Sequence, residues 1–150
     1  MLPNNEGMLT RHNIRLTLEG ARAILAAAEK KAREIGVPVN IAVVDEGAHL
    51  LVFVRMDGAK LSSIEVALTK ARAAALRCAP SGPSPSAEEP NAVLSLGLSL
   101  ATEGKLTAIR GGLPLLVDKQ YVGGIGVSAG TEDEDVLIAQ AGVDALKAMA

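Results

Sequence analysis

Arg55 and Asp57 are two residues of this chain whose types and spacing could do chemistry. They end a largely apolar stretch, residues 41–54, and stand just before Gly58. An arginine guanidinium offers a planar fork that matches a carboxylate. Arg55 could therefore hold an anionic ligand while Asp57 acts as acid or base. Alternatively, an arginine–carboxylate clamp at this point could fix the turn into the next helix.

A second group of candidates surrounds a pair of glycines. Gly111 and Gly112 follow Arg110, and paired glycines let backbone N–H groups approach an anion closely. A sharp turn would need the same glycines. Glu132 and Asp133 follow further along the chain, where they could serve as acid or base. They also suit the positive end of a helix dipole, which favours acidic side chains in the first helical turn.

A glycine-rich stretch, residues 123–130, has a superficial likeness to a dinucleotide-binding loop. It lacks the G-x-G-x-x-G opening of a strand–helix unit with an acidic residue about 20 positions later. The stretch is better interpreted as a strand whose glycines let another backbone or a flat ligand pack closely.

The chain has two histidines, His12 and His49, and a single cysteine, Cys78. A zinc site usually takes two or three His or Cys ligands, so a zinc site within one chain is not expected. A haem needs only one or two axial ligands, which His12 in the N-terminal arm could supply. His12 could also be simply solvated. His49 could line a ligand site or stabilise the turn before it, and Cys78 is predicted to be buried within a helix.

Composition narrows the class of protein. The 150 residues suit one domain, and they include one Phe, one Tyr and no Trp. The net charge of −2 and the scarcity of aromatic residues argue against nucleic-acid binding. No apolar stretch has the length of a signal-peptide core or a membrane span. We therefore expect a cytoplasmic protein with no nucleic-acid or membrane partner.

The hydrophobic periodicity predicts a single α+β domain, residues 17–150, after a flexible arm at 1–16. The sheet should be largely antiparallel because tight turns join its strands. The expected order is helix, two strands, helix, short helix, three strands and helix. The predicted helices are 18–35, 61–78, 91–101 and 132–149, and the predicted strands are 39–44, 49–56, 106–110, 113–117 and 120–127. A Pro-rich loop at 79–90 separates the two halves.

Several of these stretches together resemble the GlcG/HbpS family, the haem-degrading or DUF336 domain, which is related to the C-terminal domain of PduO-type proteins. The resemblance rests on R-M-D-G-A at 55–59, R-G-G-L-P at 110–114 and G-G-I-G-V-S-A-G at 123–130, and it covers about 16–149. It implies helices on an antiparallel sheet and homo-oligomers, often dimers that build octamers. Some members of the family bind haem, which makes His12 the candidate metal ligand.

Two functions from different classes follow. The first is a protein that binds haem or another tetrapyrrole at a subunit interface. The alternative is a small-molecule enzyme, a lyase, isomerase or hydrolase, that acts on a small carboxylate held by Arg55 and possibly Arg110. An accessory subunit without a ligand is a third possibility. Fold alone does not choose among them.

Overall fold

The computed structural model describes residues 9–83 and 91–150. The element bounds are α2 (Leu18–Ile35), β1 (Asn40–Asp45), β2 (Leu50–Arg55), α3 (Ser63–Arg77), α4 (Ala92–Ala101), β3 (Gly112–Val117), β4 (Gln120–Ser128) and α5 (Glu132–Met149). The predicted α+β class is confirmed, and each predicted helix is present within two residues of its expected bounds. The prediction of an arm at 1–16 falls partly outside the described residues, because these begin at residue 9.

The four strands form one antiparallel sheet in the order β2-β1-β4-β3. β1 is central and pairs with both β2 and β4. In this register Asn40 lies beside Arg55 and Ser128, whereas Asp45 lies beside Gly123. The ends of the strands therefore define two opposite ends of the sheet, which decide where each candidate residue lies.

The fifth strand that the sequence predicts, at residues 106–110, is not a strand in the structure. β3 begins only at Gly112, after Gly111 turns the chain with a φ of 128°. The residues before this turn have no neighbouring strand to pair with. Instead, the Ile109 N–H donates to the Thr107 hydroxyl over 3.1 Å.

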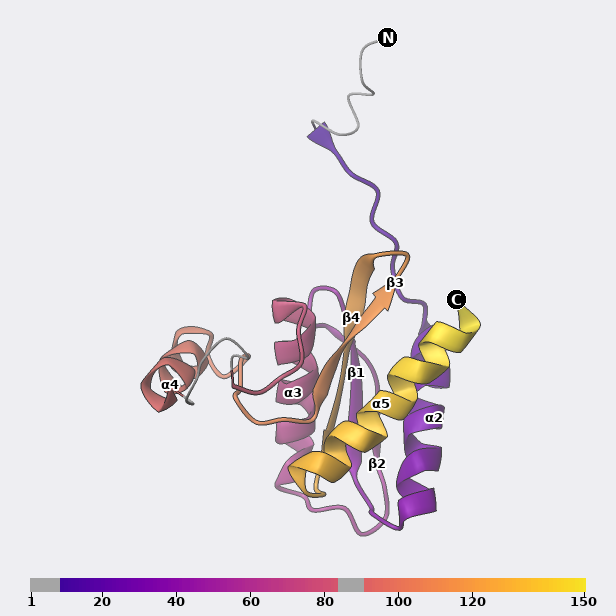
Figure 1. Cartoon of the computed structure of the whole chain (residues 1–150), viewed down its shortest axis with the longest axis vertical. Coiled ribbons are helices and arrows are strands. Elements are labelled where there is room, and N and C mark those ends of the chain that lie inside the picture. Colours follow the sequence, from indigo (N-terminus) through magenta and orange to yellow (C-terminus); the bar gives the residue numbers. More distant parts are fainter. Residues whose placement is uncertain (1–8, 84–90) are drawn as a thin grey trace.

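The sheet is sandwiched between helices (Figure 1), with α2 and α5 against one face and α3 against the other. The α2/α5 side holds the larger core, built mainly from Ala, Val, Leu and Ile. On the other face α3 approaches the backbone of β4 so closely that a Cβ at Gly124 or Gly126 would collide with main-chain atoms of α3. This close approach fills the interior without aromatic side chains, and it confirms the prediction that the glycine-rich strand packs against another backbone.

Side-chain caps fix where α2 and α5 begin. The Thr17 hydroxyl accepts from Gly20 N–H at the start of α2, and Gly36 ends this helix in the left-handed conformation. Thr131 and Glu134 form the predicted capping box of α5. The exact start of α5 matters because it places the carboxylates of its first turn at one end of the sheet.

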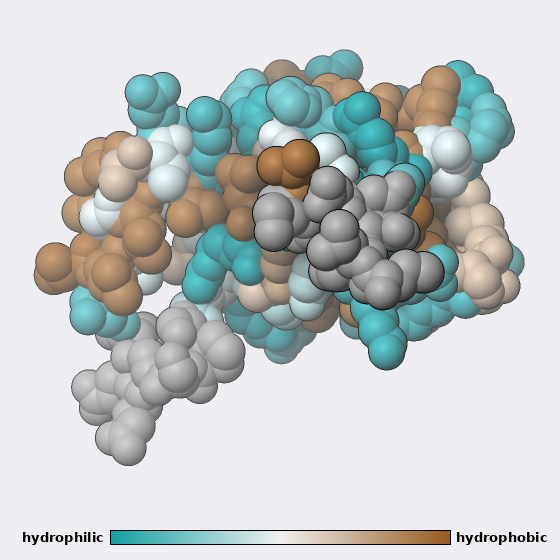
Figure 2. All heavy atoms as spheres, turned by 90° about the horizontal axis from the view of Figure 1, so that it is seen from above, coloured by the Kyte–Doolittle hydropathy of each residue, from teal (hydrophilic) through white to brown (hydrophobic). Residues whose placement is uncertain are grey.

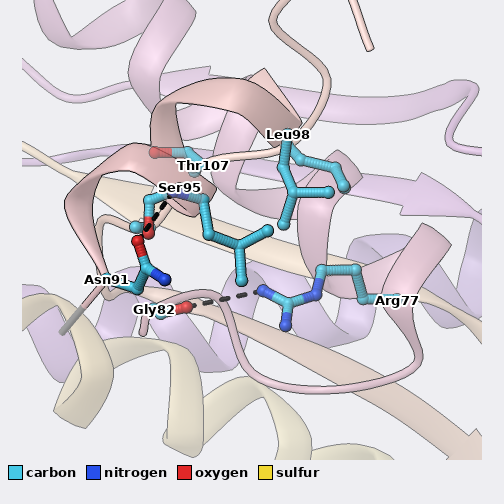
Figure 3. Close-up of a pocket in the computed structure, with 9 residues that line it drawn as sticks. Arg77, Gly82, Asn91, Ser95, Leu98 and Thr107 are labelled. Atoms are coloured by element: carbon cyan, nitrogen blue, oxygen red, sulfur yellow. Dashed lines mark hydrogen bonds between the residues drawn. The ribbon is translucent and has the colours of Figure 1, made fainter. Parts of the chain in front are cut away.

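The short helix α4 stands away from the rest of the fold (Figure 1) and has no buried residue. Brown, apolar side chains gather over it in Figure 2, at the left of the molecule. Between α4 and the body lies a small cavity of about 170 Å³, into which Arg77 of α3 extends (Figure 3). None of the site residues predicted from the sequence lines this cavity. Within the described ranges, no helix has the length and apolar character needed to cross a bilayer.

Candidate functional site

The strand register separates the predicted site residues into two groups. Arg55 and Asp57 lie at the end of the sheet where β4 leads into α5, and His49 lies at the opposite end. The six residues of β1 span roughly 20 Å between these ends. A single small ligand therefore cannot contact both groups.

Arg55 and Asp57 do not form a pair. Both side chains are exposed, and neither has a side-chain hydrogen bond or ion pair within the part of the chain that the structure describes. The proposed clamp between strand and helix is thus absent. The backbone makes this turn instead: Met56 N–H donates to Val39 C=O, and Ala59 N–H donates to Met56 C=O. Gly58 allows the turn with a φ of 89°.

The groups around the paired glycines are engaged within the protein. Arg110 contacts Asp133 over 2.7 Å in an exposed ion pair. Gly112 N–H donates to the Ser81 hydroxyl over 2.8 Å, so this amide does not face a ligand. A Cβ at Gly111 would meet the Lys70 ammonium at 2.8 Å. These contacts favour a packing role for both glycines.

Glu132 and Asp133 are exposed in the first turn of α5. Their placement suits the helix dipole, as the sequence suggests. Their use as acid or base stays a prediction, and no cavity described in the structure includes either of them.

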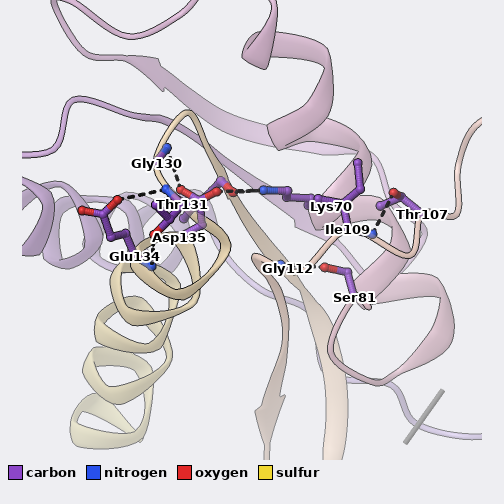
Figure 4. A network of polar contacts seen from close by, with 10 residues as sticks. Lys70, Ser81, Thr107, Ile109, Gly112, Gly130, Thr131, Glu134 and Asp135 are labelled. Carbon is purple, nitrogen blue, oxygen red and sulfur yellow. Dashed lines mark hydrogen bonds and ion pairs between the residues drawn. The ribbon is translucent and has the colours of Figure 1, made fainter. Parts of the chain in front are cut away.

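The most deeply buried charges at this end are Lys70 and Asp135, which sequence reasoning missed (Figure 4). The Lys70 ammonium lies 2.9 Å from Asp135 Oδ2 and donates to Val127 C=O over 2.8 Å. Asp135 Oδ1 accepts from Gly130 N–H over 3.0 Å. Both side chains are 2% exposed. The pair joins α3, β4 and α5 at the end of the sheet, and both side chains are shielded from solvent.

Burial raises the pKa of Asp135 above its ordinary value of 3.8, although Lys70 and the Gly130 amide act in the opposite direction. The folded protein therefore holds this proton more tightly than the unfolded chain. By linkage, the contribution of Asp135 to the free energy of unfolding falls as pH rises from 3.8 through the raised pKa.

We expect this pH dependence to be lost in Asp135→Asn. Urea unfolding from about pH 4 to about pH 7 measures it. The free energy of unfolding of wild type minus that of Asp135→Asn should fall as pH rises. A difference that rises over this range would show that the ion pair lowers the pKa instead.

At the opposite end of the sheet, Asp45 organises the turn between β1 and β2. Its Oδ1 accepts from Gly47 N–H and His49 N–H, each over 2.9 Å, and lies 3.2 Å from His49 Nδ1. Arg15 of the N-terminal arm approaches Asp45 at 3.8 Å and Glu46 at 3.1 Å. These contacts fit the turn-stabilising interpretation of His49, and they tie the arm to the sheet.

The predicted haem ligand, His12, lines a cavity of about 490 Å³ next to this turn. The arm forms one side of the cavity, and the backbone N–H of Ile14 donates to Gln120 Oε1 over 3.0 Å. The residues around it come from the arm, the β1–β2 turn, the end of α3 and the start of β4. They are Arg11, His12, Asn13, Ile14, Glu46, Cys78, Gln120 and Tyr121.

Cys78 contributes to this cavity because it is exposed, which contradicts its prediction as a buried residue. It ends α3 in the left-handed conformation, with a φ of 52°, and so lies past the buried face of the helix. In residues 9–83 and 91–150, no three His, Cys, Asp or Glu side chains gather in a way that could hold a metal ion.

Comparison with known proteins shows which family this chain belongs to. The sequence pattern of the HbpS-like proteins, described as haem-degrading, matches residues 16–144. The chain belongs to this family. The GlcG/HbpS resemblance expected from the glycine and arginine motifs is thereby confirmed over nearly the whole chain.

Individual HbpS-like relatives agree with this assignment. A 15.0 kDa protein of the dhaT–dhaS intergenic region of Citrobacter freundii is 36% identical over 129 residues, which cover 86% of this chain and 90% of the relative. The crystal structure of the Klebsiella pneumoniae protein ORFY has a TM-score of 0.83 at 37% identity and covers 93% of this chain and 97% of its own. A PduOC:heme complex has a TM-score of 0.79 at 31% identity, over 88% of this chain and 95% of its own.

Proposed function

We propose that this HbpS-like protein binds haem in the cavity beside the N-terminal arm, where His12 would hold the iron. The main support for the proposal is the set of side chains around this cavity that can bind iron. His12, Cys78 and Tyr121 all line it, and imidazole, thiolate and phenolate are three of the groups that hold haem iron in proteins. Its volume, about 490 Å³, lies within the range of small-molecule sites.

The other residues around the cavity also suit haem. Arg11 brings a guanidinium next to His12, where it can pair with a propionate carboxylate. Ile14 and the ring of Tyr121 offer apolar contact to the macrocycle. When bound, haem would supply iron-centred redox chemistry, and the protein would set the axial ligand and the polarity around it. A relative of similar fold is a haem complex, which supports the same ligand for this chain.

We further propose that the haem lies at a subunit interface in a homo-oligomer. The cavity is bordered by exposed residues of the arm, so one chain alone covers little of a flat apolar ligand. Haem sites are generally closed by protein on both faces of the ring. A second copy placed over the arm would exclude water from the second face.

The alternative, an enzyme that holds a small carboxylate with Arg55, has no observation in its favour. Arg55 lines none of the cavities described in the structure. The Arg110 guanidinium is paired with Asp133, and the Gly112 amide with Ser81. The proposed role of Arg55 stays a prediction from sequence.

A haemin titration followed at the Soret band tests the proposal. We expect saturable binding to the wild-type chain and a loss of affinity of more than about tenfold, or 1.4 kcal/mol, in His12→Ala. His49→Ala is the matched control, because it removes the other imidazole from the same end of the sheet and should bind haemin like wild type. Equal affinity of His12→Ala and wild type would rule out His12 as the ligand.

A further inference from the structure

Five of the ten residues of α4 are large apolar side chains that are exposed. Its ten residues include no charged side chain and no buried one. The exposure is uneven: Val93, Leu96 and Leu100 are 82%, 62% and 71% exposed. Leu94 and Leu98 are 53% and 37% exposed and line the small cavity toward the body, as Figure 3 shows for Leu98. The helix thus has an inner side and a more exposed outer stripe.

A partner that covers the outer side of α4 would stabilise this helix. A helix of ten residues is marginal in water by itself, and most helical stability in proteins comes from packing of an apolar face. A membrane surface is a poor candidate because α4 has no Lys or Arg on a polar face, as interfacial helices do. At about 15 Å, it is also too short to cross a bilayer.

The outer stripe is complementary to itself. Val93, Leu96, Gly97 and Leu100 have the spacing i, i+3, i+4, i+7, which places them on one side of a helix. Gly97 belongs to the open side, since a Cβ placed there would have no other atom within 4 Å. If a second α4 lies antiparallel, Leu96 of each helix faces the space above Gly97 of the other, and Val93 faces Leu100.

We propose that α4 docks on α4 of a second copy of this chain, as an antiparallel pair related by a two-fold axis between Leu96 and Gly97. A two-fold interface requires one patch that fits itself, and the leucine beside the glycine meets this requirement. The pair brings no like charges together, because neither helix has any. It also sets the positive end of each helix dipole next to the negative end of the other.

The proposed pair predicts a homodimer contact that is separate from the haem site and does not depend on haem. Four residues on a helix of about 15 Å bury less than the roughly 800 Å² per partner of a standard interface. The association through α4 should therefore depend on protein concentration. Its loss should leave haemin binding by the His12 cavity measurable.

Light scattering coupled to size exclusion tests the contact on the haem-free chain. We expect Leu100→Glu to halve the mass of the wild-type assembly at high concentration, because it would bury a carboxylate in the pair. Leu61→Glu is the matched control: Leu61 is 68% exposed but lies outside α4, and its change should leave the mass unaltered. Circular dichroism should show that both variants are folded. A wild-type chain that stays monomeric, or an unchanged mass of folded Leu100→Glu, would overturn the proposal.

Disulfide trapping tests the antiparallel geometry, in a Cys78→Ser background. The double variant Val93→Cys/Leu100→Cys should oxidise to a covalent dimer, because the thiol at position 93 of one copy faces the thiol at position 100 of the other copy. Within one helix these positions are about 10 Å apart, too far for an intrachain disulfide. Val93→Cys alone should not cross-link. Cross-linking of the single variant would indicate parallel helices, and no cross-linking of the double variant would overturn the pairing.

Discussion

Lys70→Met should lower the free energy of unfolding by about 3–5 kcal/mol, the largest loss that we expect from any single substitution in this chain. The change leaves the Asp135 carboxylate 2% exposed and without its cation. Such a carboxylate must either remain charged in a poorly solvating interior or take up a proton. The backbone carbonyl of Val127 loses its donor as well.

Urea unfolding at neutral pH measures this loss, and a second substitution separates charge from packing. Lys70→Met/Asp135→Leu removes both charges, and replacing a buried ion pair with apolar residues is often neutral or stabilising. We therefore expect the double variant to recover most of the loss. Lys30→Met is the control, since Lys30 is an exposed lysine on α2. A loss below about 1 kcal/mol in Lys70→Met would show that water reaches the pair.

Gly126→Ala should have the second largest effect, a loss of about 1–3 kcal/mol or more. A Cβ at this position would collide with the carbonyl oxygen of Ala67 and with the backbone of Ala71 on α3. Gly126 lies within β4, between β1 and β3. Neither β4 nor α3 can move away easily, because β4 is an inner strand of the sheet and the contact on α3 is with the backbone of the helix.

Thermal and urea unfolding of Gly126→Ala measure the effect, and Gly97→Ala is its matched control. Gly97 also lies within a regular element, but its Cβ position is open. Alanine is favoured over glycine inside a helix by up to about 1 kcal/mol, so Gly97→Ala should be neutral or slightly stabilising in dilute protein. Equal stability of the two variants would show that α3 can move away from the sheet.

Most of the fold could be predicted from the sequence because local signals agree with it. The apolar stripe of α2 lies between Thr17 and Gly36, which mark its two ends, and the capping box marks the start of α5. The prediction of a strand at 106–110 was wrong, because hydrophobic periodicity does not show whether a segment has a neighbouring strand. A strand needs a neighbour, and this segment has none before the turn at Gly111.

The candidate site was harder to predict because it depends on contacts between distant residues. Lys70 and Asp135 are 65 positions apart, and nothing local marks either as buried. Likewise, the sequence alone does not show how far Arg55 lies from His12. The register of β1 places Arg55 at the end of the sheet away from the arm. Cys78 follows an alanine-rich helix that indicated burial, but the helix ends there and exposes the thiol.

Alkylation of Cys78 tests the location of the haem most directly. This thiol is the chain's single cysteine, it is exposed, and it lines the cavity that contains His12. The rate of its reaction with iodoacetamide is measured with and without saturating haemin, and N-acetylcysteine with haemin controls for direct reaction of the thiol. If haem binds in this cavity, bound haemin should slow the alkylation by about tenfold or more, because reactivity requires an accessible thiolate. An unchanged rate at a haemin concentration that saturates the Soret signal would place the haem elsewhere and contradict the proposed site.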